Sequence, residues 1–168
     1  MNLIIQRGQV ISDPWRLLDA ADGDAAPAVP AAGDVIVALA TWRAQRDELL
    51  RREGRIGVVV DTAAEAAGLA PDLRHFDAIA IRFPAFTDGR GYSLARLLRE
   101  RYGYRGELRA VGDVGRDQLY YLSRCGFDAF VLRPGDDPHA AVASLRDFSE
   151  AYQTAVDRPV PLFRRRSV

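Results

Sequence analysis

The sequence predicts an α/β protein in which about five mainly parallel strands alternate with helices, preceded by an N-terminal hairpin. Short apolar runs of strand length recur along the chain, and each is followed by helix-forming residues. Strands that are apolar throughout are typical of a parallel sheet covered on both faces. A complete eight-fold barrel takes about 250 residues, more than the 168 present. The architectures left open are an open doubly wound sheet and a partial barrel.

The N-terminal part of the chain is predicted to form a small hairpin followed by a linker. Two β-prone runs, Leu3–Gln6 and Gln9–Ser12, flank Arg7-Gly8, where the glycine allows the positive φ of a tight turn. The stretch Asp22–Gly33 holds only Asp, Gly, Ala, Pro and one Val, so it has little to bury. We therefore expect three parts: a hairpin and linker over 1–33, an α/β domain over 34–156 and an arginine-rich arm over 157–168.

Within the α/β domain, apolar strands and helices are predicted in regular order. The strands are Val35–Leu39, Ile56–Val60, Ala78–Phe83, Glu107–Val111 and Ala129–Leu132. The helices are Trp42–Arg52, a short one within Ala63–Ala70, Ser93–Tyr102, Gly115–Cys125 and Asp137–Gln153. Gly54 ends the first helix, and Pro138 suits the first turn of the last one.

Composition and charge exclude several classes of protein. Apolar residues make up 48% and charged residues 27% of the chain, as in ordinary globular proteins. The 23 basic and 23 acidic residues balance, so no net field attracts a polyanion, and we expect no nucleic-acid partner. Every basic residue is an arginine. Without lysine the chain has no Walker-type phosphate loop, no Schiff-base lysine and no Ser-Lys pair.

Cysteine and histidine content argue against a metal or redox centre of the chain's own. Cys125 is the single cysteine, and we expect it to be a buried, inert thiol. His75 and His139 lie far apart and match no metal-ligand spacing. We predict no metal site and no cofactor in this chain. The N-terminus lacks a leader-like pattern and the apolar runs are short, so we expect a cytoplasmic protein without a membrane span.

The candidate site lies where the strands end, because ligands of parallel α/β sheets bind beyond the carboxyl ends of the strands. Four arginines fall at or just after these ends: Arg82, Arg90, Arg116 and Arg133. Gathered on one rim, their guanidinium groups favour a small oxyanion such as sulfate, sulfite or phosphate, or a carboxylate of a partner. The alternative partners for these arginines are nearby carboxylates of the chain itself, namely Asp88, Asp113 and Asp117.

The segment RFPAFTDGRGYS is the most unusual part of this predicted rim. It supplies the remaining candidate anion-site residues around Arg90, which are Thr87, Asp88, Gly89, Gly91 and Ser93. They come just before a predicted helix, whose first N–H groups are free to hold an anion. The alternative is a local role, in which Asp88 caps the turn, Ser93 caps the helix and the glycines adopt positive φ. Asp113 belongs to the same candidate anion site, and its alternative role is that of a helix cap.

The C-terminal arm differs in character from the rest of the chain. It holds two prolines, an apolar pair and a run of arginines, and its candidate partner-binding residues are Phe163, Arg164, Arg165 and Arg166. Such a segment suits an arm that docks on another surface. The alternative is a solvated chain end. Whether the chain also forms a homodimer is left open.

Three runs of the chain carry a resemblance to a known family. They are FPAFTDGRGYSLARLLRERYGYRGELRAVGDVGRDQLYYLSRCGFDAF (83–130), DFSEAYQTAVDRP (147–159) and the terminal PLFRRR. These runs resemble a bacterial family of unknown function, number nine-three-four, whose members are commonly labelled as oxidoreductases of sulfite reduction. The motif residues that carry over are Phe83, Pro84, Phe86, Thr87, Asp88, Gly89, Arg90, Gly91, Tyr92, Ser93, Gly112, Asp113, Arg116, Asp117, Cys125, Gly126 and Phe127.

This resemblance implies a place in assimilatory sulfur metabolism beside the sulfite reductase haemoprotein, which carries the sirohaem and the iron–sulfur cluster. It names no catalytic residue, and the chain shows no ligand set for such a group. The leading hypothesis is therefore an accessory protein or small subunit of sulfite reductase that uses the arginine rim and the arm. The rival is a free-standing enzyme or sensor that binds a phosphorylated or sulfonated small molecule. A flavin-binding reductase is a third reading.

Overall fold

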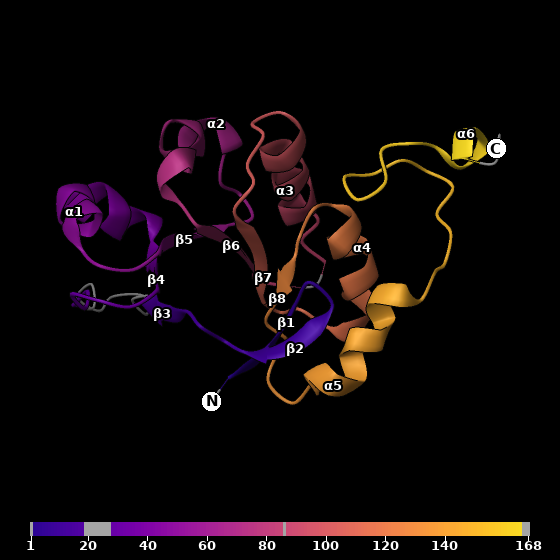
Figure 1. Cartoon of the computed structure of the whole chain (residues 1–168), viewed down its shortest axis with the longest axis horizontal. Coiled ribbons are helices and arrows are strands. Elements are labelled where there is room, and N and C mark those ends of the chain that lie inside the picture. The colour runs from indigo at the N-terminus through magenta and orange to yellow at the C-terminus, as the bar shows by residue number, and fades with distance from the viewer. Residues whose placement is uncertain (1, 19–27, 86, 166–168) are drawn as a thin grey trace.

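A single curled sheet of eight strands, flanked by helices, forms the computed structural model, which describes residues 2–18, 28–85 and 87–165 (Figure 1). The strands are β1 (Leu3–Gln6), β2 (Gln9–Ser12), β3 (Arg16–Leu18), β4 (Val35–Ala38), β5 (Ile56–Asp61), β6 (Ala78–Phe83), β7 (Glu107–Gly112) and β8 (Ala129–Phe130). The α-helices are α1 (Leu39–Arg51), α2 (Ala66–Leu69), α3 (Arg90–Glu100), α4 (Leu119–Arg124), α5 (Pro138–Ala141) and α6 (Leu162–Arg165). The 3₁₀ helices are η1 (Ala70–His75), η2 (Arg116–Gln118) and η3 (Val142–Arg146).

The order of the strands decides between the two predicted architectures. The sheet runs β2-β1-β8-β7-β6-β5-β4-β3, and the strands from β3 to β8 are parallel neighbours in sequence order. A doubly wound sheet reverses its strand order at a switch point, and this sheet has no such reversal. The α/β class is therefore confirmed, and the sheet is a curled half-barrel with an antiparallel hairpin at its β8 edge.

The helices cover one face of the sheet, which is a correction to the expectation of two covered faces. The larger buried cluster joins alternate strand residues, such as Val58 and Ile79, to residues of α1 to α5, such as Trp42 and Leu98. The strand residues between them belong to a second, smaller cluster that contains no helix residue (Trp15, Ile36, Val59, Ala78, Ala80 and Val111). Figure 1 shows the helices following one another around the outside of the sheet. The inner, concave face is left without a helical layer.

Continuous apolar strands predict helices on both faces of the sheet. Here the concave face is apolar but is not covered by helices. Its central positions are small: Gly57, Ala78 and Ala80 lie on neighbouring strands. A Cβ at Gly57 would come within 2.8 Å of the Ile36 side chain and 2.9 Å of the Ala78 carbonyl oxygen, so β5 depends on glycine here. Trp15, in the connection between β2 and β3, packs against this face from the N-terminal segment.

The N-terminal hairpin is confirmed, and it belongs to the same sheet. The Arg7-Gly8 turn has positive φ at both residues, 47° and 78°, as the tightest hairpin turns require. Ile5 pairs with Phe130 of β8, so the hairpin closes one edge of the sheet. Strand β3 at the opposite edge is not predicted by the sequence pattern. Residues 19–27, including half of the predicted linker, lie outside the described residues, and the three-part division stays a prediction.

The last predicted helix, Asp137–Gln153, is wrong in its length. The structure has only α5 and η3 there, and helical geometry ends at Arg146. A helix is held mainly by burying an apolar face, but Phe148 and Tyr152, the i,i+4 pair of the predicted helix, are 62% and 74% exposed. The chain instead continues without regular structure to α6 (Figure 1). In the part of the chain that the structure describes, no helix has the length and apolar character needed to cross a bilayer.

Candidate functional site

One group of predicted site residues gathers where β5 and β6 end. Arg90 donates two hydrogen bonds to Asp88, from Nε to Oδ1 at 2.9 Å and from Nη2 to Oδ2 at 2.7 Å. The Thr62 hydroxyl donates to the same carboxylate at 2.6 Å. The hydrogen bonds from Arg90 and then from Thr62 hold the pKa of Asp88 well below its ordinary value. Arg90 is thus paired with a carboxylate of the chain itself, which is the alternative stated above for the strand-end arginines.

The predicted helix start in this region needs a correction. Helix α3 begins at Arg90, so Ser93 lies inside the helix and is not its cap. Gly89 precedes the helix at a φ of −75°, so positive φ is not the reason for this glycine. Gly91 is required for space, because a Cβ there would lie 2.6 Å from the Phe83 ring. Thr87 is exposed in the preceding turn, and Phe86 lies outside the described residues.

A second group lies beyond β7 and β8. The Arg133 guanidinium pairs with Asp113 at 3.4 Å and with Asp136 at 3.2 Å. It also lies against Gly115, since a Cβ on this glycine would be 3.3 Å from the Arg133 guanidinium carbon. Arg116 donates from Nε to the Ser144 hydroxyl at 2.6 Å. The predicted arginines are therefore divided between local partners, and their role in binding an anion stays a prediction.

Arg82, the remaining predicted arginine, lies on the concave face of the sheet. It lines a cavity of about 570 Å³ there together with Arg109, Trp15 and Asp13. The complete lining is Asn2, Asp13, Trp15, Arg16, Leu17, Ile36, Ala80, Arg82, Arg109, Val111, Gly112 and Val131. This concave pocket is thus built from the N-terminal segment and from strands β3, β4, β6 and β7, and Val131 follows β8 directly.

A buried polar network forms one wall of the concave pocket. Arg109, whose side chain is 3% exposed, donates from Nε to Glu107 at 2.7 Å and from Nη1 to both oxygens of Asp13 at 2.9 and 2.7 Å. Glu107 also accepts hydrogen bonds from Gln6 at 2.5 Å and from the Trp15 indole at 3.3 Å. The network therefore ties the N-terminal segment to β7. The Nη2 atom of Arg109 is buried and has no hydrogen-bond partner.

Sequence reasoning missed Arg109, Trp15 and Asp13. A signal was present in the strand Glu107–Val111, where two charged residues alternate with apolar ones. Charges at alternate positions of a strand place both on one face, and this spacing is unexpected in a sheet buried on both faces. Trp15 and Asp13 carry no comparable signal, because only the tertiary fold brings them to β7.

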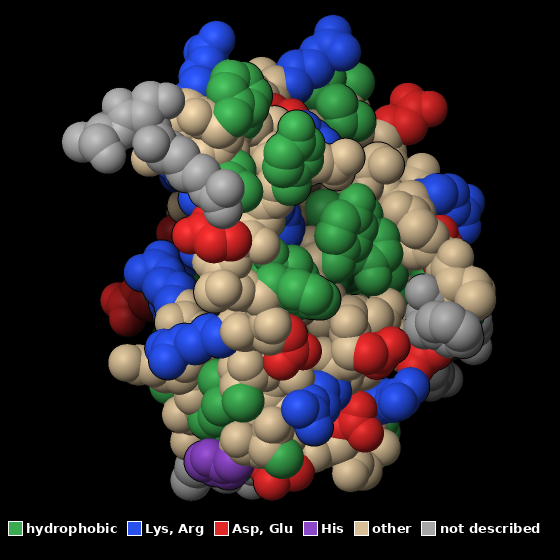
Figure 2. Space-filling view, turned by 90° about the vertical axis from the view of Figure 1, so that its right-hand side faces the viewer, with side chains coloured by type: hydrophobic (Ala, Val, Ile, Leu, Met, Phe, Trp, Pro, Cys, Tyr) green, Lys and Arg blue, Asp and Glu red, His purple; other side chains and the backbone are tan. Residues whose placement is uncertain are grey.

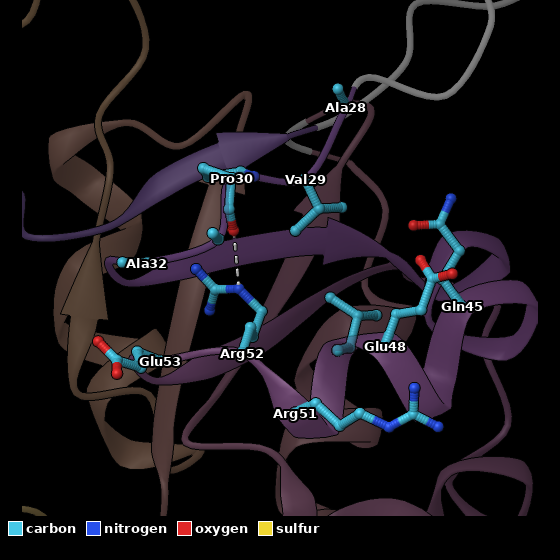
Figure 3. A pocket seen from close by; sticks show the side chains of 11 residues that line it. Ala28, Val29, Pro30, Ala32, Gln45, Glu48, Arg51, Arg52 and Glu53 are labelled. Atoms are coloured by element: carbon cyan, nitrogen blue, oxygen red, sulfur yellow. Dashed lines mark hydrogen bonds between the residues drawn. The ribbon is translucent and has the colours of Figure 1, made fainter.

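A larger hollow of about 710 Å³ lies between residues 28–32 and the C-terminal half of α1 (Figure 3). Its central side chain, Arg52, donates from Nε to the Pro30 carbonyl at 3.1 Å and from Nη2 to the Gly33 carbonyl at 2.5 Å. These bonds fasten the segment before β4 to the end of α1. Because the Arg52 guanidinium is already hydrogen-bonded to backbone carbonyls, we interpret this hollow as a structural feature and not as a ligand site.

The remaining candidate residues occupy structural positions. Cys125 is 6% exposed, and burial raises the pKa of its thiol, which disfavours the reactive thiolate. His75 contacts Arg46 at 3.2 Å and lies near the Trp42 ring. His139 lies in α5, where its backbone N–H donates to Asp137. Among the described residues, no three His, Cys, Asp or Glu side chains are grouped as a metal site.

The predicted arm is partly tied to the rest of the molecule. Arg165 pairs with Glu150 at 3.2 Å and donates to the Ala151 carbonyl at 3.0 Å. Phe163 is 62% exposed, and Arg164 lies over its ring. Arg166 lies outside the described residues.

Fold and pockets together define a half-barrel α/β protein whose concave face carries an arginine-containing pocket. The chain belongs to the family described as "Bacterial protein of unknown function (DUF934)", whose model matches residues 57–163. The matched region runs from β5 to α6 and includes both groups of strand-end arginines. A search of curated proteins finds no match.

Proposed function

We propose that this protein is an accessory protein of assimilatory sulfite reduction. It docks onto the sulfite reductase haemoprotein through its C-terminal segment, defined here as residues 147–165. The observation that carries the docking role is a set of exposed apolar side chains on this segment. Phe148, Tyr152, Val160 and Phe163 are 62%, 74%, 47% and 62% exposed. Large exposed apolar groups that lie together are typical of protein-binding surfaces. Figure 2 shows hydrophobic side chains gathered on the side of the molecule that carries α4 and this segment.

The middle of the C-terminal segment is hydrogen-bonded to the folded body of the protein. This favours an ordered docking surface and argues against a solvated chain end. The Val156 N–H donates to the Arg124 carbonyl at 3.1 Å, and Arg124 Nη2 donates to the Gln153 carbonyl at 2.5 Å. Arg124 is only 6% exposed, so this anchor is part of the folded body. The ring of Phe148 lies 4.9 Å from that of Tyr120 on α4. A surface that is ordered before binding loses less entropy on binding.

The choice of partner rests on the family resemblance and on the chemistry of this chain. Members of the family are commonly labelled as proteins of sulfite reduction, and that reaction needs a redox centre. This chain has one cysteine, Cys125, which is buried with a raised thiol pKa, so the redox centre of the proposal is on the partner. The sirohaem and the iron–sulfur cluster belong to the haemoprotein.

The strand-end arginines are the second part of the proposal. Arg90 and Arg133 have side chains that are 64% and 47% exposed, so an oxyanion or a partner's carboxylate reaches them. It has to compete with Asp88 and Asp113, which already pair with these arginines. Binding is therefore expected to be weak and sensitive to salt. Such contacts suit an accessory role better than a tight substrate site.

Co-purification with variants tests this proposal. The tagged chain is expected to retain the sulfite reductase haemoprotein of the same organism, and Tyr152→Ser combined with Phe163→Ser is expected to weaken retention at least about tenfold. Leu50→Ser is the matched control, because Leu50 is 42% exposed on α1, away from the C-terminal segment. Equal retention by the double variant and the wild type, or no retention by either, would overturn the proposal.

A further inference from the structure

The concave pocket exists because the middle of the sheet carries small side chains. In a closed parallel barrel, bulky side chains fill the interior in layers. Here Gly57, Ala78 and Ala80 occupy the corresponding central positions, and no helix residue joins the cluster on this face. The result is a cavity of about 570 Å³, a size typical of small-molecule sites.

The lining of the concave pocket combines an apolar wall with arginines. Its apolar lining residues are Trp15, Leu17, Ile36, Ala80, Val111 and Val131. Its charged lining residues are Arg16, Arg82, Arg109 and Asp13, so the basic groups outnumber the acidic one. An apolar wall with a few polar groups at defined positions is the usual composition of a ligand pocket. The excess of guanidinium groups favours a negatively charged ligand.

The side chain of Arg109 is held in a fixed position where it lines the concave pocket. Two of its three guanidinium nitrogens, Nε and Nη1, donate to Glu107 and Asp13, while the buried Nη2 has no partner. Arg109 has no freedom to turn toward another acceptor, since the two carboxylates fix its plane. Arg82, which lines the same pocket, is therefore the arginine that a ligand carboxylate contacts in this proposal.

We propose that the concave pocket binds a small organic carboxylate. The apolar body of the ligand lies against Trp15 and Val111, and its carboxylate oxygens accept hydrogen bonds from the Arg82 guanidinium. This inference differs from the proposed function in both site and partner, because the pocket lies on the face of the sheet opposite the helices. A bare inorganic oxyanion leaves the apolar wall uncovered and is expected to bind more weakly than a carboxylate with an apolar body.

Nuclear magnetic resonance on the intact chain tests this inference, with benzoate as the organic carboxylate and sulfate as the bare oxyanion. The chain has two tryptophans, which give two indole N–H signals. Trp15 lines the pocket, whereas Trp42 is buried under the helices and donates to Asp72. Benzoate is expected to shift the Trp15 signal in a saturable way and to leave the Trp42 signal in place. Benzyl alcohol, which has the same ring and no charge, is expected to have a much smaller effect.

Two variants locate the binding. Arg82→Gln is expected to weaken benzoate binding about tenfold or more, because it removes a charge-assisted hydrogen bond. Ala80→Leu fills the centre of the pocket and is expected to abolish the shift, while the unchanged Trp42 signal reports that the variant is folded. Arg96→Gln is the matched control, since it removes an exposed arginine of α3 that pairs with Glu100, and it is expected to bind benzoate as the wild type does.

Three results would overturn the inference. The first is an unshifted Trp15 signal at millimolar benzoate. The second is an equal response to benzyl alcohol or to sulfate, because the ligand class would then be wrong. The third is undiminished binding by the folded Ala80→Leu variant, which would place the benzoate elsewhere. Loss of the haemoprotein complex leaves all of these measurements unaffected, so the two proposals fail separately.

Discussion

At the residue scale, Arg109 has the strongest structural consequence. Its guanidinium lies between two carboxylates, Glu107 and Asp13, on the concave side of the sheet. Arg109→Met leaves these carboxylates unpaired and is expected to lower the free energy of unfolding by about 3–5 kcal/mol. Chemical denaturation measures this loss. The control is Arg96→Gln on the exposed Arg96–Glu100 pair, with an expected change below about 0.5 kcal/mol. Similar losses in the two variants would contradict the account of the network.

The hydrogen-bonded carboxylate of Asp88 makes the stability of the fold depend on pH. Because Arg90 and Thr62 hold its folded-state pKa below the ordinary value of 3.8, the unfolded chain takes up the proton first as the pH falls. The contribution of Asp88 to stability is therefore present at neutral pH and is lost as the pH falls below about 4. Asp88→Asn is expected to lose less stability than the wild type between about pH 5 and pH 3. Urea unfolding at both pH values checks this, and identical losses would count against it.

At the element scale, the packing of α3 against β6 depends on Gly91. A methyl group at this position would lie 2.6 Å from the Phe83 ring and 3.0 Å from the Thr62 methyl group. Gly91→Ala is therefore expected to destabilise the protein by about 1–3 kcal/mol, although alanine is the better helix former. Gly68→Ala in α2 is the control, because open space surrounds that position. It is expected to be neutral or stabilising by up to about 1 kcal/mol. Thermal unfolding of both variants decides the point.

The elements that the sequence predicts correctly are those whose signal is local. Strands β4 to β6 come from mainly apolar runs, β7 comes from the alternating run Glu107–Val111, and the hairpin comes from its Arg7-Gly8 turn. Strand β3 is missed because three residues give no periodic pattern, and its pairing with β4 is a tertiary contact. The overlong last helix has the opposite cause. Its residues favour a helix, but the fold leaves most of the Phe148 and Tyr152 side chains exposed, so a helix there would bury little apolar surface.

In the candidate site, too, the sequence predicts what depends on local signals and misses what depends on tertiary contacts. The sequence correctly places Asp88, Arg90, Asp113 and Arg133 at strand ends, because each follows a recognisable strand. Which arginine faces which carboxylate depends on side-chain geometry that no pattern encodes. The concave pocket depends on bringing Trp15 beside Arg109, residues that lie almost a hundred positions apart. Only the curled sheet makes that contact.

At the scale of the whole molecule, the half-barrel separates two surfaces. The helices cover the convex face and α4 anchors the C-terminal segment with its exposed aromatic side chains, while the concave face keeps a pocket of about 570 Å³ (Figure 1). A partner bound to the C-terminal segment therefore leaves the concave pocket open. This separation lets the proposed docking surface and the proposed ligand pocket act independently.

The central claim is that the chain forms a complex with the sulfite reductase haemoprotein. Sedimentation velocity of an equimolar mixture, followed at the absorbance of the haem, tests it most directly. The account predicts that the haem-containing species sediments faster with this chain than without it. It also predicts that the Tyr152→Ser, Phe163→Ser variant loses this change while Leu50→Ser keeps it. Identical sedimentation of the haem-containing species with and without the wild-type chain would contradict the account.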